Sequence, residues 1–382
     1  MILVAEGIRP GAKQLTKELT DFVGGEAVKP FLLLLVLAVV GCASTQSPRV
    51  ADSSARGRWA GKTVVITGAS SGFGRGAAVE FGRQGANVVL AARRTNLLDE
   101  VAGEVRGGGG TPLVVTTDVS KAGDIERLAQ AAVRRFGRID VWINNAGLGV
   151  VGPFWDAPVA DYSRLIDINL KGVVYGSHAA VRQFRAQGGG TLVNVGSVVS
   201  EVPMAYYACY SATKAGVLSL DRALNEELRL NRLTGNIKVA TIMPWAVDTP
   251  WWKHAANYSG HTPRMLALDD PSKVVNAIVN TAEHPSKEVL IGWKAQGAYI
   301  SHRIAPDITE TISGNIVQRE QMEKGASAPV TTGSLYRPIQ AGRLVEGGQR
   351  EEMKREDQQR RLSPRRPKIQ DRSDARVIVR LA

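Results

Sequence analysis

The sequence predicts an α/β fold, in which a doubly wound sheet of about seven parallel strands is flanked by helices. Two observations support this prediction. From Gly61 onward, short apolar runs rich in β-branched residues alternate with longer stretches of helical periodicity. These longer stretches also suffice for the crossovers that parallel strands require. The chain of 382 residues is therefore expected to form one large core with extensions at both ends.

An extension over residues 1–58 precedes the predicted domain. It contains the apolar run 31–43, which is shorter than the ~20 residues needed to cross a bilayer and has the length of the apolar part of a signal peptide. Val39-Val40-Gly41-Cys42 resembles a bacterial lipoprotein processing site, and translation from Val28 would make residues 1–27 an artefact. We favour a short membrane anchor with the following domain in the cytosol, where nucleotide cofactors are supplied. Lipoprotein-like export and a buried or artefactual segment are the alternatives.

Seven strands and six helices are expected in order along the main domain, residues 59–295. Each strand is a short apolar run bounded by turn residues. The strands are expected near residues 63–67, 87–91, 112–116, 140–144, 191–195, 237–242 and 288–291. The helices are expected to begin near Gly72, Thr95, Lys121, Val159, Tyr207 and Pro271.

The turn after the first strand, residues 67–74, has the features of a site for a nucleotide phosphate. Gly68 permits a sharp exit from the strand, Gly72 lets backbone N–H groups approach a pyrophosphate, and Gly74 lets the helix pack closely on the strand. An ordinary turn between strand and helix is the alternative. We expect the turn to bind the cofactor through Gly68, Ser70, Ser71, Gly72, Phe73 and Gly74.

Two arginines follow the second strand, where such folds hold the adenosine ribose. An acidic residue there would accept the 2′-hydroxyl of NAD, but this chain has Ala92-Arg93-Arg94. A guanidinium suits a 2′-phosphate, which predicts NADP as the cofactor, with Arg93 as the better candidate and Arg75 adding positive charge. Two solvated arginines at a strand end are the alternative.

The third and fourth strands end in further candidate cofactor ligands. Asp118 and Val119 follow the third strand, and a carboxylate there can accept a hydrogen bond from the adenine amino group; a plain helix start, which Ser120 would cap better, is the alternative. After the fourth strand, small residues allow the backbone to approach a nucleotide, and Asn144 can brace neighbouring strands. The candidates there are Asn145, Ala146 and Gly147.

Together, residues 67–74, Asn-Asn-Ala-Gly at 144–147, Ser197 and Tyr-Ser-Ala-Thr-Lys at 210–214 resemble the classical short-chain dehydrogenase/reductase family over about residues 60–295. The resemblance implies a Rossmann-type sheet of seven parallel strands, a nicotinamide cofactor and a catalytic set of four residues. Carried over by motif, that set is Asn169, Ser197, Tyr210 and Lys214. No metal site is expected.

Elementary chemistry supports these roles. A free tyrosine has a pKa near ~10, so its phenolate needs a nearby cation to form at neutral pH. Lys214 lies one helical turn from Tyr210 and is expected to lower the pKa of its phenol, while Ser197 binds the substrate oxygen. Asn169 is expected to hold a water that links Lys214 to solvent. Taken singly, the tyrosine and lysine would be read as a solvated helical pair.

The stretch after the sixth strand completes the predicted site. Pro244, Val247 and Thr249 are expected near the nicotinamide, although Trp245 stands where the resembled family has glycine. Trp251, Trp252, Tyr258 and Met265 then favour an apolar or extended substrate. A hydrophobic surface that docks another subunit or a membrane is the alternative.

The C-terminal part is expected to comprise a helical extension over residues 296–324 and a disordered basic tail over 325–382. Residues 350–382 contain eleven Lys/Arg and six Asp/Glu, and aromatic residues are few. Together these observations predict an NADP-dependent oxidoreductase that acts on a small carbonyl or alcohol. It is expected to form a homo-oligomer and to bind no specific nucleic acid. The alternatives are a non-catalytic NADP(H)-binding sensor and a membrane-associated protein that acts through its basic tail.

Overall fold

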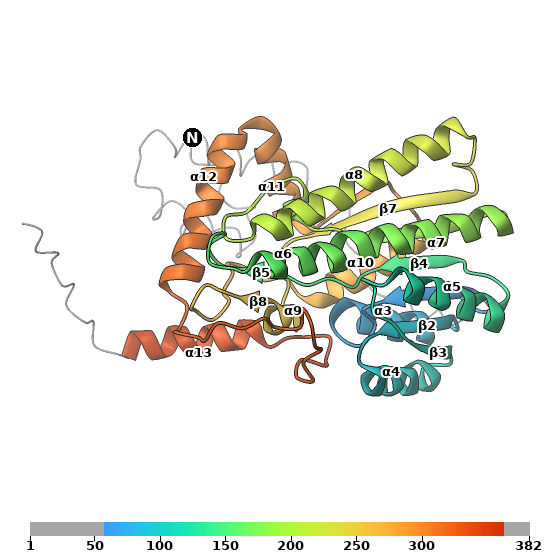
Figure 1. Ribbon diagram of the computed structural model, residues 1–382, viewed down its shortest axis with the longest axis horizontal. Helices are drawn as coiled ribbons and strands as arrows, with labels where there is room; N and C mark the ends of the chain where they lie inside the picture. The colour runs from blue at the N-terminus through green and yellow to red at the C-terminus, as the bar shows by residue number, and fades with distance from the viewer. Residues whose placement is uncertain (1–56, 363–382) are drawn as a thin grey trace, which may run out of the picture.

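The computed structural model describes residues 57–362 and contains a seven-stranded, wholly parallel sheet (Figure 1). The strand order is β3-β2-β1-β4-β6-β7-β9. Every predicted strand is present, with bounds shifted by no more than two residues. The bounds are β1 Thr63–Thr67, β2 Asn87–Ala92, β3 Thr111–Thr116, β4 Val141–Asn144, β6 Gly190–Val195, β7 Ile237–Pro244 and β9 Glu288–Ile291.

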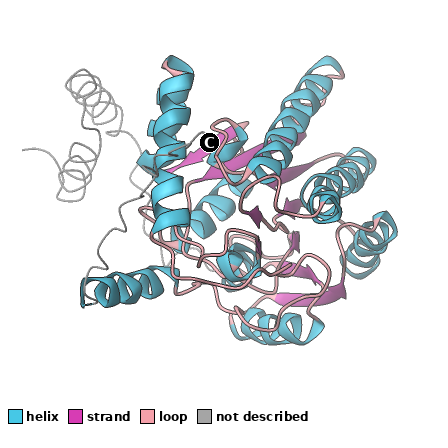
Figure 2. Ribbon diagram, turned by 60° about the vertical axis from the view of Figure 1, so that its left-hand side comes forward, coloured by secondary structure: helices cyan, strands magenta, loops and turns pink. Residues whose placement is uncertain are grey.

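Helices cover both faces of this sheet, which Figure 2 shows on either side of the strands. Alternation within β1 explains the arrangement, because Val64 and Ile66 enter one hydrophobic core while Val65 enters the other. The first core is closed by α3 (Gly72–Arg83), α4 (Thr95–Gly107) and α10 (Pro271–Glu283). The second is closed by α5 (Ala122–Phe136), α7 (Gly172–Gln187) and α8 (Ala208–Leu230).

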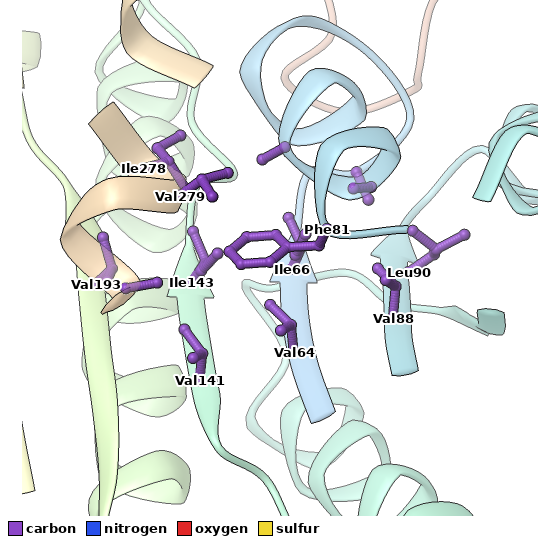
Figure 3. Packing of buried hydrophobic residues seen from close by; sticks show 14 of the residues in the cluster. Val64, Ile66, Phe81, Val88, Leu90, Val141, Ile143, Val193, Ile278 and Val279 are labelled. Carbon is purple, nitrogen blue, oxygen red and sulfur yellow. The ribbon is translucent and has the colours of Figure 1, made fainter. Parts of the chain in front are cut away.

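The first core holds the helix that follows the glycine-rich turn firmly against the sheet. Figure 3 shows the ring of Phe81 on α3 lying over the strands beside Ile66 and Ile143. Trp59 adds an edge-to-face contact with Phe81, with 5.0 Å between ring centroids. A fully buried side chain of this size contributes about 1.5–3 kcal/mol through removal from water. The N-terminus of α3 is thereby fixed at the carboxyl edge of the sheet.

The order of the strands places a crevice beside β1. The chain moves from β1 to β2 and β3 on one side, and then returns to β4 on the other. Connections that leave β1 and β4 therefore run to opposite sides, and ligands of open α/β sheets bind where this happens. β6 and β7 end at the same edge, so the predicted site residues Ser197 and Pro244 lie there too.

Several short elements border this edge and were not predicted. β5 (Val150–Val151) pairs with β8 (Ala256–Asn257), and α9 (Trp251–His254) lies between β7 and β8. The π-helical η3 (Asp167–Lys171) and the 3₁₀ turn η4 (Val198–Ser200) were not predicted either, whereas α6 (Val159–Ile166) begins where a helix was expected. The predicted helical extension begins slightly earlier than expected and consists of α11 (Gly292–Ile304), α12 (Pro306–Val317) and η5 (Gln318–Glu323).

The prediction of disorder from residue 325 is wrong for the part of the tail that the structure describes. Residues 325–348 cross the main domain, where Leu335 is fully buried, and α13 (Gln349–Leu362) follows. α13 is held through Arg264, whose 1% exposed side chain pairs with Glu356 and Asp357. The prediction failed because composition does not show which charged groups of the tail find a buried partner in the main domain.

The apolar run 31–43, the localisation inferred from it and the last residues of the basic tail lie outside the described residues. Within residues 57–362, no helix combines the length and the apolar character that crossing a bilayer would require.

Candidate active site

A cavity of about 250 Å³ opens at the carboxyl edge of the sheet and joins most of the predicted site. Its walls come from the ends of β1, β2, β4, β6 and β7 together with α8 and α9. The predicted residues that line it are Gly68, Ser70, Ser71, Gly72, Phe73, Arg93, Asp118, Val119, Asn145, Ala146, Gly147, Ser197, Tyr210, Lys214, Pro244, Val247 and Thr249. Gly74 and Asn169 lie behind the walls.

The glycine-rich turn has the close packing that its sequence predicts. Gly68 has a φ of +70°, and a Cβ there would lie 2.9 Å from Ala146 Cα. A Cβ on Gly74 would lie 2.4 Å from the carbonyl oxygen of Gly68. Neither position accepts a side chain, so backbone rather than side chains forms the floor of the cavity. Such a floor beside the N-terminus of α3 fits the pyrophosphate of a dinucleotide.

Arg93 and Arg94 both line the cavity, but both are also bound by the C-terminal part of the chain. Arg93 Nη2 donates to the carbonyl of Ser334 (2.5 Å), and Arg94 Nη1 donates to that of Ile339 (3.0 Å). Arg94 also reaches Ser70 Oγ at 3.0 Å, so it belongs to the site as much as Arg93, which the sequence had favoured.

The charge around these two guanidiniums is poorly compensated. Burial lowers the pKa of Arg93, and burial with the neighbouring arginines lowers that of Arg94 to about 10. Asp118 partly opposes the effect on Arg93 by raising its pKa, but within residues 57–362 neither guanidinium forms an ion pair with a carboxylate. Arg75, which was expected to add charge, pairs with Glu104 outside the cavity.

Asp118 lies at the same end of the cavity as Arg93, and its carboxylate is already engaged. Its carboxylate accepts from Arg164 Nη2 (2.9 Å) and from the hydroxyl of Ser120 (2.8 Å). Desolvation raises the pKa of Asp118, but these hydrogen bonds outweigh it and the pKa lies below its usual value. That Asp118 accepts a hydrogen bond from the adenine amino group stays a prediction. The sequence did not predict its ion pair with Arg164.

The two asparagines at the end of β4 brace the strands beneath the cavity. Asn144 Nδ2 donates to Asn194 Oδ1 of β6 (2.8 Å), as expected of a strand brace. Asn145 Nδ2 donates to the carbonyl of Thr67 at the end of β1 (2.9 Å). Both interactions hold the floor of the site across three neighbouring strands.

Ser197, Tyr210 and Lys214 meet at the opposite end of the cavity. Ser197 follows β6 and caps η4 by accepting from the N–H of Val199 (3.3 Å). Tyr210 and Lys214 lie one turn apart on α8, with Lys214 Nζ 5.8 Å from the centroid of the phenol ring. Lys214 Nζ donates to the carbonyl of Val195 (2.7 Å), which fixes the ammonium beneath the ring.

Burial, rather than the lysine, controls the pKa of Tyr210. Desolvation raises that pKa to about 12, and a hydrogen bond with Ser197 opposes the change only in part. Desolvation also lowers the pKa of Lys214 to about 8. The pKa of the phenol thus moves in the opposite direction to the lowering expected from Lys214, because desolvation of the phenolate dominates. The phenol keeps its proton at neutral pH, which suits a proton donor.

Asn169 makes contacts that were not predicted for its side chain. It is fully buried in η3, where its side chain accepts from the N–H of Leu148 (2.9 Å) and donates to the carbonyl of Leu148 (2.8 Å). The side chain thus clamps the loop after β4. A water linking Lys214 to solvent stays a prediction.

The end of the cavity beyond Tyr210 is apolar. Trp251 packs on Tyr210 with 5.3 Å between ring centroids and meets Trp252 edge-on. Met265 also lines this end, as predicted, but Tyr258 instead points to Asp161 and does not line the cavity. Lining residues that the sequence did not single out for the substrate end are Leu148, Val198, Val199, Met204 and Tyr207. Their ordinary apolar character gave no signal before the fold was known.

A metal centre finds no support in residues 57–362, where no three His, Cys, Asp or Glu side chains gather in a way that could hold an ion.

Comparisons with known proteins agree with this geometry. Residues 62–258 match the family described as short chain dehydrogenase. The chain is 33% identical over 278 residues to the uncharacterized oxidoreductase YxnA of Bacillus subtilis, covering 72% of this chain and 78% of that protein. It is 37% identical over 192 residues to 3beta-hydroxysteroid dehydrogenase 1 of Eggerthella lenta, covering 50% of this chain and 72% of that protein.

Among solved structures, the fold resembles an alcohol dehydrogenase from the archaeon Thermococcus sibiricus complexed with 5-hydroxy-NADP. The TM-score is 0.53 at 26% identity, and the match covers 60% of this chain and 95% of that one.

Proposed function

Since this chain belongs to the short-chain dehydrogenase family of oxidoreductases, we propose that it is an NADP(H)-dependent enzyme acting on a carbonyl or secondary alcohol. One observation carries the proposal: a single cavity joins a glycine turn and two arginines at one end to Ser197, Tyr210 and Lys214 at the other. The nicotinamide, when bound, supplies or accepts the hydride. The chain must therefore orient the substrate and move one proton.

The three side chains divide this work. Tyr210 donates its proton to the substrate oxygen during reduction, because a phenol with a pKa of about 12 is fully protonated at neutral pH. Ser197 orients that oxygen from the end of β6. Lys214 stabilises the phenolate that is left behind, as long as its own ammonium stays charged.

Two guanidiniums that form no ion pair with a carboxylate support the proposed preference for NADP(H). A 2′-phosphate would supply the missing anion in bidentate geometry. Arg93→Asp should weaken NADPH binding more than tenfold and NADH binding far less, as titration of each cofactor can measure. Arg83→Asp is the matched control, because Arg83 on α3 pairs only with Glu80 and its side chain is 67% exposed. Equal affinity of the unmutated protein for NADH would contradict the preference.

The substrate is proposed to be an extended apolar alcohol or ketone. Two tryptophans, Trp251 and Trp252, line the end beyond Tyr210 together with the methionine Met265, and these side chains offer large contact area with few polar demands. The relative named as a hydroxysteroid dehydrogenase supports the same class. NADPH oxidation against steroids, ketones, aldehydes and acyl-thioesters tests it. Turnover confined to small polar carbonyls would contradict it.

Membrane association through residues 31–43 and assembly into a homo-oligomer remain predictions from the sequence. The two alternatives also remain: a non-catalytic sensor that binds NADP(H), and a membrane-associated protein that acts through its basic tail.

A further inference from the structure

Residues 334–345, which we name the clasp, lie across the adenosine end of the cavity. Figure 1 shows this stretch looping beside α9 before it enters α13, and the contact between His254 and the carbonyl of Ala341 (2.9 Å) confirms the proximity. Ser334 and Pro338 line the cavity itself. The C-terminal part of the chain is thus a wall of the proposed cofactor site.

The clasp presents a row of backbone carbonyl oxygens to the site. Ser334 and Leu335 accept from the guanidinium of Arg93, and Ile339 accepts from that of Arg94. The carbonyl of Leu344 accepts from the backbone N–H of Gly72 (3.0 Å), at the N-terminus of α3. Three separate groups in the site therefore each donate to an oxygen of the clasp.

These donors are the ones that a phosphorylated dinucleotide would use. A guanidinium and the N–H groups of a helix N-terminus are typical phosphate ligands, and a carbonyl oxygen offers them a neutral acceptor where phosphate offers a charged one. The bonds from the guanidiniums to the carbonyls are already assisted by one charge, and a phosphate adds an opposite charge and bidentate geometry that a carbonyl does not offer. An anion at the same place should therefore displace the carbonyls rather than add to them.

Contacts outside the site keep the clasp in place. The Tyr336 hydroxyl donates to Asp161 Oδ1 (2.8 Å), and Arg75 Nη1 donates to the carbonyl of Arg343 (2.7 Å). Gly342 has a φ of +68°, and a Cβ there would lie 2.8 Å from Pro250 Cβ and 2.9 Å from His254 Nε2. The clasp is therefore a defined structure that fits its seat only with glycine at this position.

We propose that the clasp is an internal competitor of the cofactor, whose carbonyl oxygens occupy Arg93 and Arg94 until the 2′-phosphate of NADP(H) displaces them. This inference rests on the proposed use of NADP(H). Because two ligands that exclude each other are coupled reciprocally, loosening the clasp raises the affinity for NADPH, and NADPH loosens the clasp. NADH, which lacks the 2′-phosphate, displaces it less.

Hydrogen exchange on the unmutated full chain tests the second half of this coupling. The Ser334 N–H donates to the carbonyl of His254 and the Ile339 N–H to Ser334 Oγ, so both amides are protected while the clasp is seated. Saturating NADPH should speed exchange in peptides covering residues 334–345, and saturating NADH should speed it less. Unchanged or slower exchange with bound NADPH would overturn the proposal and make the clasp a fixed wall or a lid.

Cofactor titration of two glycine variants tests the first half. Gly342→Ala should unseat the clasp and strengthen NADPH binding on the order of tenfold, within the usual range of coupling between sites. Gly348→Ala is the matched control, because its φ is +76° but no atom lies within 4 Å of the added Cβ. Unchanged or weaker binding by Gly342→Ala would overturn the proposal. Failure of both cofactors to bind any version would overturn the proposed function with it, whereas NADPH binding without clasp release overturns this inference alone.

Discussion

At the scale of single residues, Tyr210 and Lys214 show that burial decides protonation in this site. Both groups are removed from water, which favours the neutral form of each, so the pKa of the phenol rises to about 12 and that of the ammonium falls to about 8. The pair is therefore held as a protonated phenol above an ammonium that is close to losing its charge.

Tyr210→Phe should abolish most turnover while leaving cofactor binding almost unchanged. The variant keeps the ring that packs against Trp251 but loses the transferable proton. A positioned acid contributes about 10²–10⁴-fold, so kcat should fall by that factor. Steady-state kinetics on an identified substrate, with an NADPH titration as control, measures the effect. Near-normal turnover would assign the proton to Ser197 or to water instead.

The rate of carbonyl reduction should fall as pH rises through about 8. Lys214 has a pKa lowered to that value by burial, so its ammonium is present below pH 8 and lost above it. The phenol of Tyr210, with a pKa of about 12, stays protonated throughout and contributes no step in this range. A pH profile of kcat measures the step, and Lys214→Met should remove it together with most of the activity. A flat profile to pH 10 would contradict this assignment.

At the scale of elements, the site depends on how closely α3 approaches β1 and the turn between them. Gly74 has no room for a methyl group, because the obstacle is the backbone oxygen of Gly68 rather than a mobile side chain. The same turn forms the floor of the cavity, so packing and cofactor binding share one constraint.

Gly74→Ala should destabilise the protein by about 1–3 kcal/mol, the cost of forcing an extra methyl group into a packed site. Gly103→Ala on α4 is the control, since no atom lies within 4 Å of that Cβ and alanine favours a helix by about 0.5–1 kcal/mol. Urea unfolding of both variants measures the difference. If the two variants shift the free energy of unfolding in the same direction, the close contact between α3 and the turn after β1 does not limit stability.

At the scale of the whole molecule, the C-terminal chain is tied to the main domain at two places, the clasp and α13. α13 is strongly polar, and two ion-pair groups attach it: Arg350 of the helix pairs with the buried Asp248, and Arg264, a buried guanidinium of the main domain, meets two carboxylates of the helix. Removing one partner leaves a buried charge partly unpaired, which costs more than a surface ion pair contributes.

Glu356→Gln should therefore lower the free energy of opening α13 by about 1–3 kcal/mol. Glu351→Gln on the same helix is the matched control, because Glu351 pairs only with exposed Lys354 and should change little. Hydrogen exchange of α13 amides compares the two variants. Equal protection in both would show that α13 is held by other contacts.

The sequence by itself determined the strands of the sheet and those parts of the site that short motifs form. Strands and glycine turns are local patterns, so β-branched runs and the spacing of Gly68, Gly72 and Gly74 located β1, α3 and the cavity floor correctly. The four-residue spacing of Tyr210 and Lys214 likewise put them on one face of α8. The family was also recognisable, because its motifs are short and continuous in sequence.

Only the tertiary structure decided what surrounds those motifs. Contacts between Arg93 and Ser334 or between Arg264 and Glu356 join residues 92 to 241 positions apart, and composition had assigned the later partners to a disordered tail. The pKa of Tyr210 depends on burial, which spacing along one helix does not show. Long-range contacts and desolvation arise only when the whole chain has folded, so local patterns carry no record of them.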